Sequence, residues 1–412
     1  MPDMVNRPEY LHQLVENRDR NLVKVITGIR SCGKSSLLYM FHNYLSEDGV
    51  PAANIIHMDL ESSKYRSLTD QFAFYDYVSK QISPKEKTYL IFDELQLVSG
   101  WEKVIEFFWL DSDVDIYIAS SNAYLLSEEF TTLLSGHYME IRMLPLSFRE
   151  FLIFHEFEAS VTKDEKFQQY LQFGGMPVLR EYHFDELKSS QTLKGIYSTI
   201  VLCDILQRNH QADQNMLHRI ITFLCSNIGN TGSPNSIGNI LSKEKKIDKK
   251  VGRNVSGKTI DRYITMSQKA FLFCPAGRYD VKNRQYLKTL GKNYMTDMGF
   301  RNMLLGYCDA DREQVLENIV FLELIRRGYR VSIAKVGPVE VDFVAERANE
   351  KLYIQVTESM DSPEAMEREL RPLQMIPDNY EKTVLSMDRN FIQSYEGIRI
   401  WNIIDWLLGE TS

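Results

Sequence analysis

The chain has 412 residues, enough for roughly two to four domains of ordinary size. Hydrophobic residues make up 44% and charged residues 25%, a composition that excludes disordered, collagen-like and disulfide-rich proteins. The 48 basic and 56 acidic residues give a net charge of −8, which excludes a uniformly basic nucleic-acid binder and leaves a local basic patch open.

The cysteines and the N-terminal residues indicate the cellular compartment of the protein. The five cysteines are scattered and lack metal-ligand spacing, so neither a zinc site nor a disulfide framework is expected. The first twenty residues are charged, and no run of about 18 apolar residues follows. The sequence therefore predicts a cytoplasmic protein without a membrane partner.

The first predicted domain is an α/β unit. After an N-terminal arm over 1–20, short apolar runs alternate with helical stretches over 21–150, which is typical of a parallel sheet. The apolar runs are continuous, as expected where helices cover both faces of the sheet. Strands are predicted over 22–27, 54–60, 88–93, 115–120 and 138–144.

A phosphate-binding motif follows the first predicted strand. The pattern GxxxxGK[ST] is matched at Gly28, Ile29, Arg30, Ser31, Cys32, Gly33, Lys34 and Ser35. Its glycines let backbone N–H groups close around phosphate oxygens, and the predicted helix that follows adds its positive end, with Ser36 among the expected nucleotide-binding residues. Lys34 is expected to meet the β- and γ-phosphates of ATP, and Ser35 to bind Mg²⁺. The alternative is a glycine turn with only a structural role.

Two further strand ends carry candidate catalytic groups. The apolar run 89–92 is followed by Asp93, expected to hold Mg²⁺, and Glu94, expected to polarise the attacking water. Alternatively, two acidic residues simply end a strand in solvent. At the tip of the strand 115–120, Asn122 is expected to sense the γ-phosphate or to position the water, with Ser121 in reserve and a plain helix N-cap as the alternative.

The remaining chain divides into three predicted segments. A helical subdomain covers 151–210 and is interrupted by the turn at 174–177. Three helices and a hairpin, the order of a winged helix, follow over 211–306. The segment 312–412 has a helix, three strands, a helix and two strands, so the whole chain is of the α/β class.

Several motifs resemble a known family. The phosphate loop, the hydrophobic-Asp-Glu strand and the polar-tipped strand resemble AAA-plus ATPases. More closely, a family of bacterial and archaeal ATPases is similar in the ordered motifs KVITGIRSCGKSSLL, FDELQ, GWEKV, IASSNAYLLS, TTLLSG, LPLSFREF, GGMP and ENIVFLELIRRGY. The similarity spans about Arg7 to Asp388. It implies an ATP-binding module, a winged-helix-like segment and a restriction-endonuclease-like domain.

Two positions depart from that family. His137 stands where the family usually has an arginine after a glycine, and a mostly neutral imidazole cannot replace a fixed guanidinium fork. Arg30 is followed by Ser31, where a second arginine is common. Both departures leave ATP binding intact and predict slow turnover.

The segment 312–412 resembles the core of PD-(D/E)xK nucleases. Glu317 and Asp342 fit that pattern, but Gln355 stands in place of the second carboxylate and Thr357 in place of the lysine. An amide does not replace a carboxylate on Mg²⁺, and a threonine cannot act as an ammonium. We therefore expect a degenerate binding or scaffolding domain without nuclease activity.

A local basic stretch leaves a nucleic-acid partner open. It lies before the third winged-helix-like helix and is continued on the hairpin, with the residues Lys243, Lys245, Lys246, Lys249, Lys250, Arg253, Lys258, Lys282, Arg284 and Lys288. The alternative is a solvated loop.

Three functions follow from these features. The first is a slow Mg²⁺-dependent ATPase acting as a nucleotide switch. The second is a nucleic-acid-binding or processing protein under ATP control. The third is an interaction module that binds nucleotide only for folding. A homo-oligomer is left open.

Overall fold

The computed structural model describes residues 7–126, 128–209, 211–244, 256–308, 311–389 and 393–410. The chain forms two compact units. Met1–Pro145 with Lys269–Phe271 make the first, and Leu146–Gln268 with Leu272–Ser412 make the second.

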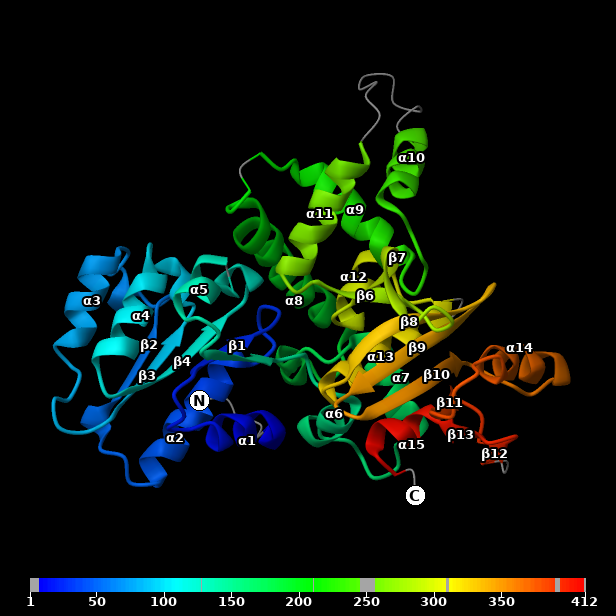
Figure 1. Ribbon diagram of the computed structural model, residues 1–412, viewed down its shortest axis with the longest axis horizontal. Coiled ribbons are helices and arrows are strands. Elements are labelled where there is room, and N and C mark those ends of the chain that lie inside the picture. Colours follow the sequence, from blue (N-terminus) through cyan, green and yellow to red (C-terminus); the bar gives the residue numbers. More distant parts are fainter. Residues whose placement is uncertain are drawn as a thin grey trace. The chain divides into compact units, whose positions relative to one another are not determined.

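The first unit is built on a five-stranded parallel sheet in the order β2-β3-β4-β1-β5. Helices α3, α4 and α5 lie on one side of this sheet, and α1 and α2 on the other (Figure 1). The elements are α1 (Pro8–Glu16), β1 (Val23–Thr27), α2 (Lys34–Glu47), β2 (Ile55–Asp59), α3 (Gln71–Ser79), β3 (Thr88–Asp93), α4 (Trp101–Asp111), β4 (Val114–Ser120), α5 (Glu128–Leu133) and β5 (Tyr138–Arg142). The predicted α/β class is confirmed.

Apolar strands between helical layers explain this architecture. Every residue of β1 and β3 is buried, as continuous apolar runs require when both faces are covered. Phe74 of α3 packs edge-on against Phe92 of β3 at 5.2 Å between ring centroids. The core therefore fixes the strand from which Asp93 and Glu94 emerge.

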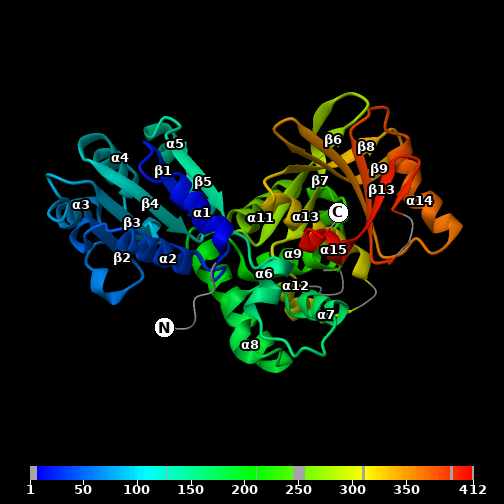
Figure 2. The ribbon, with the colours of Figure 1, turned by 90° about the horizontal axis from the view of Figure 1, so that it is seen from below.

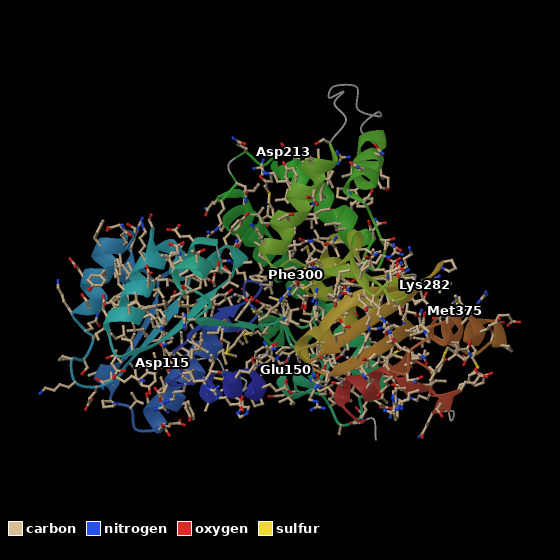
Figure 3. The ribbon with its side chains drawn as sticks, viewed as in Figure 1. Asp115, Glu150, Asp213, Lys282, Phe300 and Met375 are labelled. Atoms are coloured by element: carbon tan, nitrogen blue, oxygen red, sulfur yellow. The ribbon has the colours of Figure 1, made fainter. Side chains whose placement is uncertain are left out.

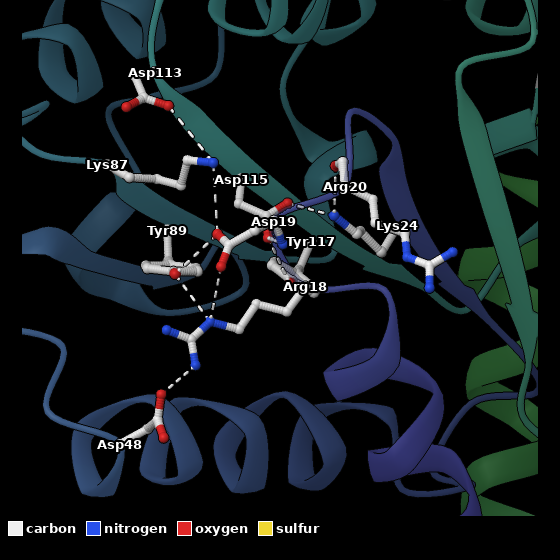
Figure 4. A network of polar contacts seen from close by, with 10 residues as sticks. All are labelled: Arg18, Asp19, Arg20, Lys24, Asp48, Lys87, Tyr89, Asp113, Asp115 and Tyr117. Atoms are coloured by element: carbon white, nitrogen blue, oxygen red, sulfur yellow. Dashed lines mark hydrogen bonds and ion pairs between the residues drawn. The ribbon is translucent and has the colours of Figure 1, made fainter.

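A polar network lies at the end of this sheet where strands β1, β3 and β4 begin (Figure 4). Lys24 and Asp115 form a fully buried ion pair, and Asp115 also accepts hydrogen bonds from the Tyr117 hydroxyl and the Asp19 backbone N–H, both at 2.8 Å. Arg18 donates to Asp48 and, at 3.0 Å, to the hydroxyl of Tyr89. The network anchors the segment between α1 and β1 to the sheet.

The second unit begins with helices, several of which start at side-chain caps. Thr162 caps α7 through a reciprocal hydrogen-bond pair with Glu165, and Asp213 caps α9 through the Met216 N–H (Figure 3). The helices are α6 (Phe148–Phe154), α7 (Lys163–Phe173), α8 (Glu186–Thr199), the π-helix η6 (Ile200–Leu206), α9 (Gln214–Ser226), α10 (Pro234–Glu244), α11 (Gly257–Lys269) and α12 (Met298–Leu305).

The predicted break at Gly174 has a steric cause. Gly174 has φ +77°, and a Cβ there would lie 2.3 Å from Oδ1 of Asp297. The next residue, Gly175, donates its N–H to Oδ2 of Asp297 at 2.6 Å. The turn therefore needs glycine because a buried carboxylate occupies the space of a side chain.

An eight-stranded mixed sheet completes the second unit, in the order β12-β13-β11-β10-β9-β8-β6-β7. Its elements and flanking helices are β6 (Phe273–Asp280), β7 (Gln285–Met295), α13 (Arg312–Arg326), β8 (Arg330–Val336), β9 (Val339–Arg347), β10 (Glu350–Thr357), α14 (Pro363–Gln374), β11 (Glu381–Ser386), β12 (Ser394–Tyr395), β13 (Ile398–Asn402) and α15 (Ile403–Leu408).

This sheet corrects the expectation of a separate hairpin within 211–306. Strand β6 pairs in parallel with β8, so the hairpin that carries Lys282 at its turn is part of the C-terminal sheet (Figure 3). Along the chain, β7 and two helices lie between β6 and β8. Hydrophobic periodicity indicates where a strand lies, but it does not indicate which strand it pairs with. The segments 211–306 and 312–412 therefore share one sheet.

Helices α13 and α14 cover opposite faces of this sheet. Neighbouring residues of a strand point to opposite faces. Phe343 contacts Phe321 of α13, whereas Val344 belongs to the core cluster that contains Leu370 of α14. Both helices flank the yellow and orange strands in Figure 2. None of the helices in the described ranges is long and apolar enough to span a bilayer.

Candidate functional site

The phosphate loop joins β1 to α2 through a turn that its glycines permit. Gly33 has φ +108°, and a Cβ on Gly28 would lie 2.2 Å from the carbonyl oxygen of Met143. Ser31 also has a positive φ, of 65°, between these glycines. The loop therefore has the tight backbone that the sequence motif predicts, directly before the positive end of a helix of 14 residues.

Lys34 lies inside this turn. Its Nζ donates to the carbonyl oxygens of Gly28 at 3.0 Å and Ile29 at 3.1 Å, and the residue is 4% exposed. Ser35 and Ser36 are exposed in the first turn of α2. The ammonium is thus held against the loop, and both serines lie at the surface beside it.

Asp93 lies beside Ser35 at the carboxyl end of β3. Burial raises the pKa of its carboxyl to about 6, and the charge of Glu94 adds to this, while a hydrogen bond with Ser35 and the charge of Lys34 lower it. Its Oδ1 is buried and has no hydrogen-bond partner among the described residues. A carboxylate oxygen without a donor, next to a hydroxyl group and a phosphate loop, fits the ligand chemistry of Mg²⁺.

Glu94 is held by the tip of the neighbouring strand. Its Oε2 accepts from the Ser121 hydroxyl at 3.1 Å, from the Ser121 N–H at 3.4 Å and from Nε2 of Gln96. Strand β4 lies between β1 and β3, so its tip reaches both the phosphate loop and the acidic pair. Arg30 of the loop also contacts the Ser121 hydroxyl at 3.5 Å and pairs with Glu61 at 3.0 Å.

Asn122 follows Ser121, and its side-chain oxygen is bonded within the next turn rather than to Glu94. Asn122 Oδ1 accepts the backbone N–H of Tyr124 at 2.9 Å, the capping geometry that the sequence left as the alternative. The contact with Glu94 is made by Ser121. Gln96 was missed by the sequence analysis, although it is the last residue of the motif FDELQ.

His137 lies at the amino end of β5. It is exposed, its Nδ1 lies 3.0 Å from the carbonyl oxygen of Leu134, and its ring packs on Trp109 at 4.9 Å. These contacts fix the imidazole within the first unit.

The second unit contains a separate polar cluster around Asp342, Gln355 and Thr357. Asp342 Oδ2 accepts the N–H of Val356 at 2.8 Å, and Gln355 donates to Glu369 at 3.0 Å. Burial and then the charge of Glu317 raise the pKa of Asp342 well above its usual range. Thr357 donates to Glu313 at 3.4 Å.

A lysine enters this cluster from another strand. Lys292 of β7 donates to Glu317 at 2.9 Å and lies 3.0 Å from Glu340, and the Tyr294 hydroxyl also donates to Glu317. The sequence comparison with nucleases missed Lys292 because β7 precedes the segment 312–412. Within the described ranges, no three His, Cys, Asp or Glu side chains are arranged to hold a metal ion. The expectation of no nuclease activity stays a prediction.

Part of the predicted basic surface lies outside the described residues, namely Lys245, Lys246, Lys249, Lys250 and Arg253. The side chains of Lys243 and Lys288 do so as well. Lys258 lies on α11, and Lys282 and Arg284 lie at the exposed hairpin turn.

Comparisons with known proteins identify the family of the chain and of its first unit. Residues 20–152 match the family described as an AAA domain, and residues 164–311 match a domain of unknown function, DUF8612. An uncharacterized protein of Haemophilus influenzae is 37% identical over 407 residues, which cover 98% of this chain and 99% of that protein. The chain belongs to the family of this protein. The first unit of this chain is an AAA-type ATP-binding domain.

Two more distant proteins are similar to this chain, one in sequence and one in structure. The protein MJ1544 of Methanocaldococcus jannaschii is 27% identical over 377 residues, covering 88% of this chain and 79% of that protein. The solved structure of the Walker-type ATPase PABY2304 of Pyrococcus abyssi matches with a TM-score of 0.50 and 16% identity, over 73% of this chain and 95% of the other. This match supports the fold.

Proposed function

We propose that this AAA-family chain is a slow Mg²⁺-dependent ATPase that acts as a nucleotide switch. The observation that carries the proposal is the buried Oδ1 of Asp93, which lacks a hydrogen-bond donor and lies in a carboxylate bonded to Ser35 at the mouth of the phosphate loop. Such an arrangement leaves one carboxylate oxygen for a cation that accompanies the phosphates.

Each residue then has a defined role. The N–H groups of the loop and the start of α2 bind phosphate oxygens, and Lys34 exchanges the carbonyls of Gly28 and Ile29 for the β- and γ-phosphates. Ser35 and Asp93 would hold Mg²⁺, which neutralises phosphate charge when bound.

Glu94 provides the base. Its carboxylate accepts the proton of the attacking water, and the bonds from Ser121 and Gln96 fix the direction of that carboxylate. Ser121 thus helps to position the water through Glu94, and Asn122, whose Oδ1 caps the following turn, stays the first candidate for sensing the γ-phosphate.

Slow turnover of ATP follows from the presence of His137 where the similar family usually has an arginine. His137 is engaged by the carbonyl oxygen of Leu134, and an imidazole lacks the fixed guanidinium fork of an arginine. No arginine replaces it at this sequence position, so stabilisation of the charge that develops on the phosphates depends on Lys34 and Mg²⁺.

A nucleic-acid partner is part of a second proposed function. Lys258, Lys282 and Arg284 favour a second function, in which DNA or RNA binds and ATP controls that binding. ATP hydrolysis with and without DNA or RNA separates the two functions, because only the second predicts stimulation. A cytoplasmic location and a homo-oligomer are compatible with either.

The substitution Glu94→Gln tests the proposed role of the base. It keeps the size and most of the hydrogen bonds and removes the proton acceptor, so ATP affinity should persist while hydrolysis falls by about 10²-fold or more. Glu106→Gln on α4 makes the same charge change outside the site and should hydrolyse ATP as the wild type does. Equal hydrolysis by Glu94→Gln and the wild type would remove Glu94 from the mechanism.

A further inference from the structure

We propose that Arg7 is a positioning residue of the nucleotide site: it orients the Cys32–Gly33 peptide so that the Gly33 N–H points into the phosphate-binding turn. The inference rests on the nucleotide site proposed above. It gives a role in ligand binding to residues that the sequence presents only as an N-terminal arm.

Arg7 is buried against the phosphate loop. It is 3% exposed, and its Nη1 donates to the carbonyl oxygens of Cys32 at 3.2 Å and Leu144 at 2.9 Å. Its Nη2 donates to the carbonyl oxygen of Pro145 at 3.5 Å. The guanidinium also lies 4.5 Å from the ring centre of Tyr10, whose hydroxyl accepts the N–H of Leu144 at 3.2 Å.

The contact with Cys32 has a consequence for the next residue. In a trans peptide the C=O and the N–H of the following residue point in opposite directions, and no described peptide bond is cis. A guanidinium that holds the Cys32 oxygen on the outside of the loop therefore directs the Gly33 N–H to the inside. Gly33 is the N-cap of α2, and the N–H groups at this end of a helix have no partner within the helix and can bind an anion.

The neighbouring carbonyls of the loop are fixed in the same way. Lys34 binds the oxygens of Gly28 and Ile29, and the Cys32 N–H donates to the Ile29 oxygen at 3.3 Å. Lys34 must leave these oxygens to reach phosphate, whereas Arg7 is buried and can stay. Arg7 is thus the cation that can preserve the shape of the loop after a nucleotide binds.

A purely structural role makes different predictions. Arg7 joins α1, the phosphate loop and the residues after β5, so its loss lowers stability under either account. Only a positioning role changes nucleotide affinity among folded molecules. Because linkage is reciprocal, a positioning role also requires nucleotide binding to slow hydrogen exchange of the backbone amides of residues 9–16 in α1.

The experiment measures ADP and ATP binding to Arg7→Lys, Arg7→Met and the control Arg18→Met. Arg18 also anchors the N-terminal segment through its guanidinium, but at the other end of the sheet. We expect Arg7→Met to weaken the affinity for both nucleotides by about tenfold, Arg7→Lys by less, and Arg18→Met not at all. KM for ATP should rise in Arg7→Met with kcat nearly unchanged, because the loop binds substrate and transition state alike.

The outcomes distinguish this inference from the proposed function. Wild-type affinity in folded Arg7→Met and Arg7→Lys, or α1 exchange that ADP does not slow, would overturn the role of Arg7 alone. If Arg7→Met does not fold, Arg7→Lys retains the charge and gives the deciding comparison. A wild-type protein that binds neither ADP nor ATP would overturn the nucleotide site and the role of Arg7 together.

Discussion

At the scale of single residues, Asp93 shows how the site combines burial with a charged function. Asp93 ends the fully buried strand β3. Burial, and then the charge of Glu94, raise the pKa of its carboxyl to about 6. A cation near Asp93 favours its charged form. If Asp93 holds Mg²⁺ as proposed, metal binding and proton loss at its carboxyl are therefore coupled.

This coupling predicts a pH dependence. Below pH 6 Asp93 is protonated, and a neutral carboxyl is a poor ligand for Mg²⁺. The Mg²⁺ concentration that half-saturates binding of a non-hydrolysable ATP analogue should therefore rise by up to about tenfold for each unit that pH falls below about 6. Calorimetric titrations at several pH values measure this.

The variant Glu94→Gln is the matched control for the pH titration. It removes the charge that helps to raise the pKa of Asp93, so the midpoint should move to lower pH, while the titration of the nucleotide's own phosphates is unchanged. Identical pH profiles for the two proteins would show that Asp93 does not control metal binding.

At the scale of secondary-structure elements, distant strands supply groups to both polar sites. In the first unit, β4 lies between β1 and β3 and so brings Ser121 to Glu94. In the second unit, β7 brings Lys292 to Glu317 of α13, with both side chains nearly excluded from water. Lys292 thereby places a positive charge among the carboxylates of Glu317 and Glu340.

Removal of this charge should be costly. Lys292→Met leaves Glu317 buried without its counter-charge, and breaking a buried pair typically costs about 3–5 kcal/mol of unfolding free energy. Lys163→Met breaks the solvent-exposed pair with Glu410 in the same unit and should cost less than about 1 kcal/mol. Urea unfolding compares the two variants, and equal losses would show that the cluster is not buried as described.

At the scale of the whole molecule, local patterns predicted the first unit more fully than the second. The phosphate loop, its strand and its helix are continuous in sequence, so one motif fixes their geometry. The partner of a strand is set by tertiary packing, and the pairing of β6 with β8 had no local signal.

The same limit applies to the sites. Arg7 and Lys292 act on residues 25 positions away from them in the sequence, through contacts that only the fold creates. Gln96 lies two residues from Glu94, and its role depends on the left-handed backbone of Glu94, with φ 51°. Residue types and spacing therefore indicated the chemistry of the ATP site, and the three-dimensional arrangement identified the residues that position it.

The most direct measurement of the central claim is equilibrium binding of Mg·ATP to the wild type, to Lys34→Ala and to Lys64→Ala, a control with an exposed lysine of the same unit. Lys34 is the cation held inside the phosphate loop, so its loss should abolish measurable binding, whereas Lys64→Ala should bind as the wild type does. Undiminished affinity in folded Lys34→Ala would contradict the assignment of the nucleotide site.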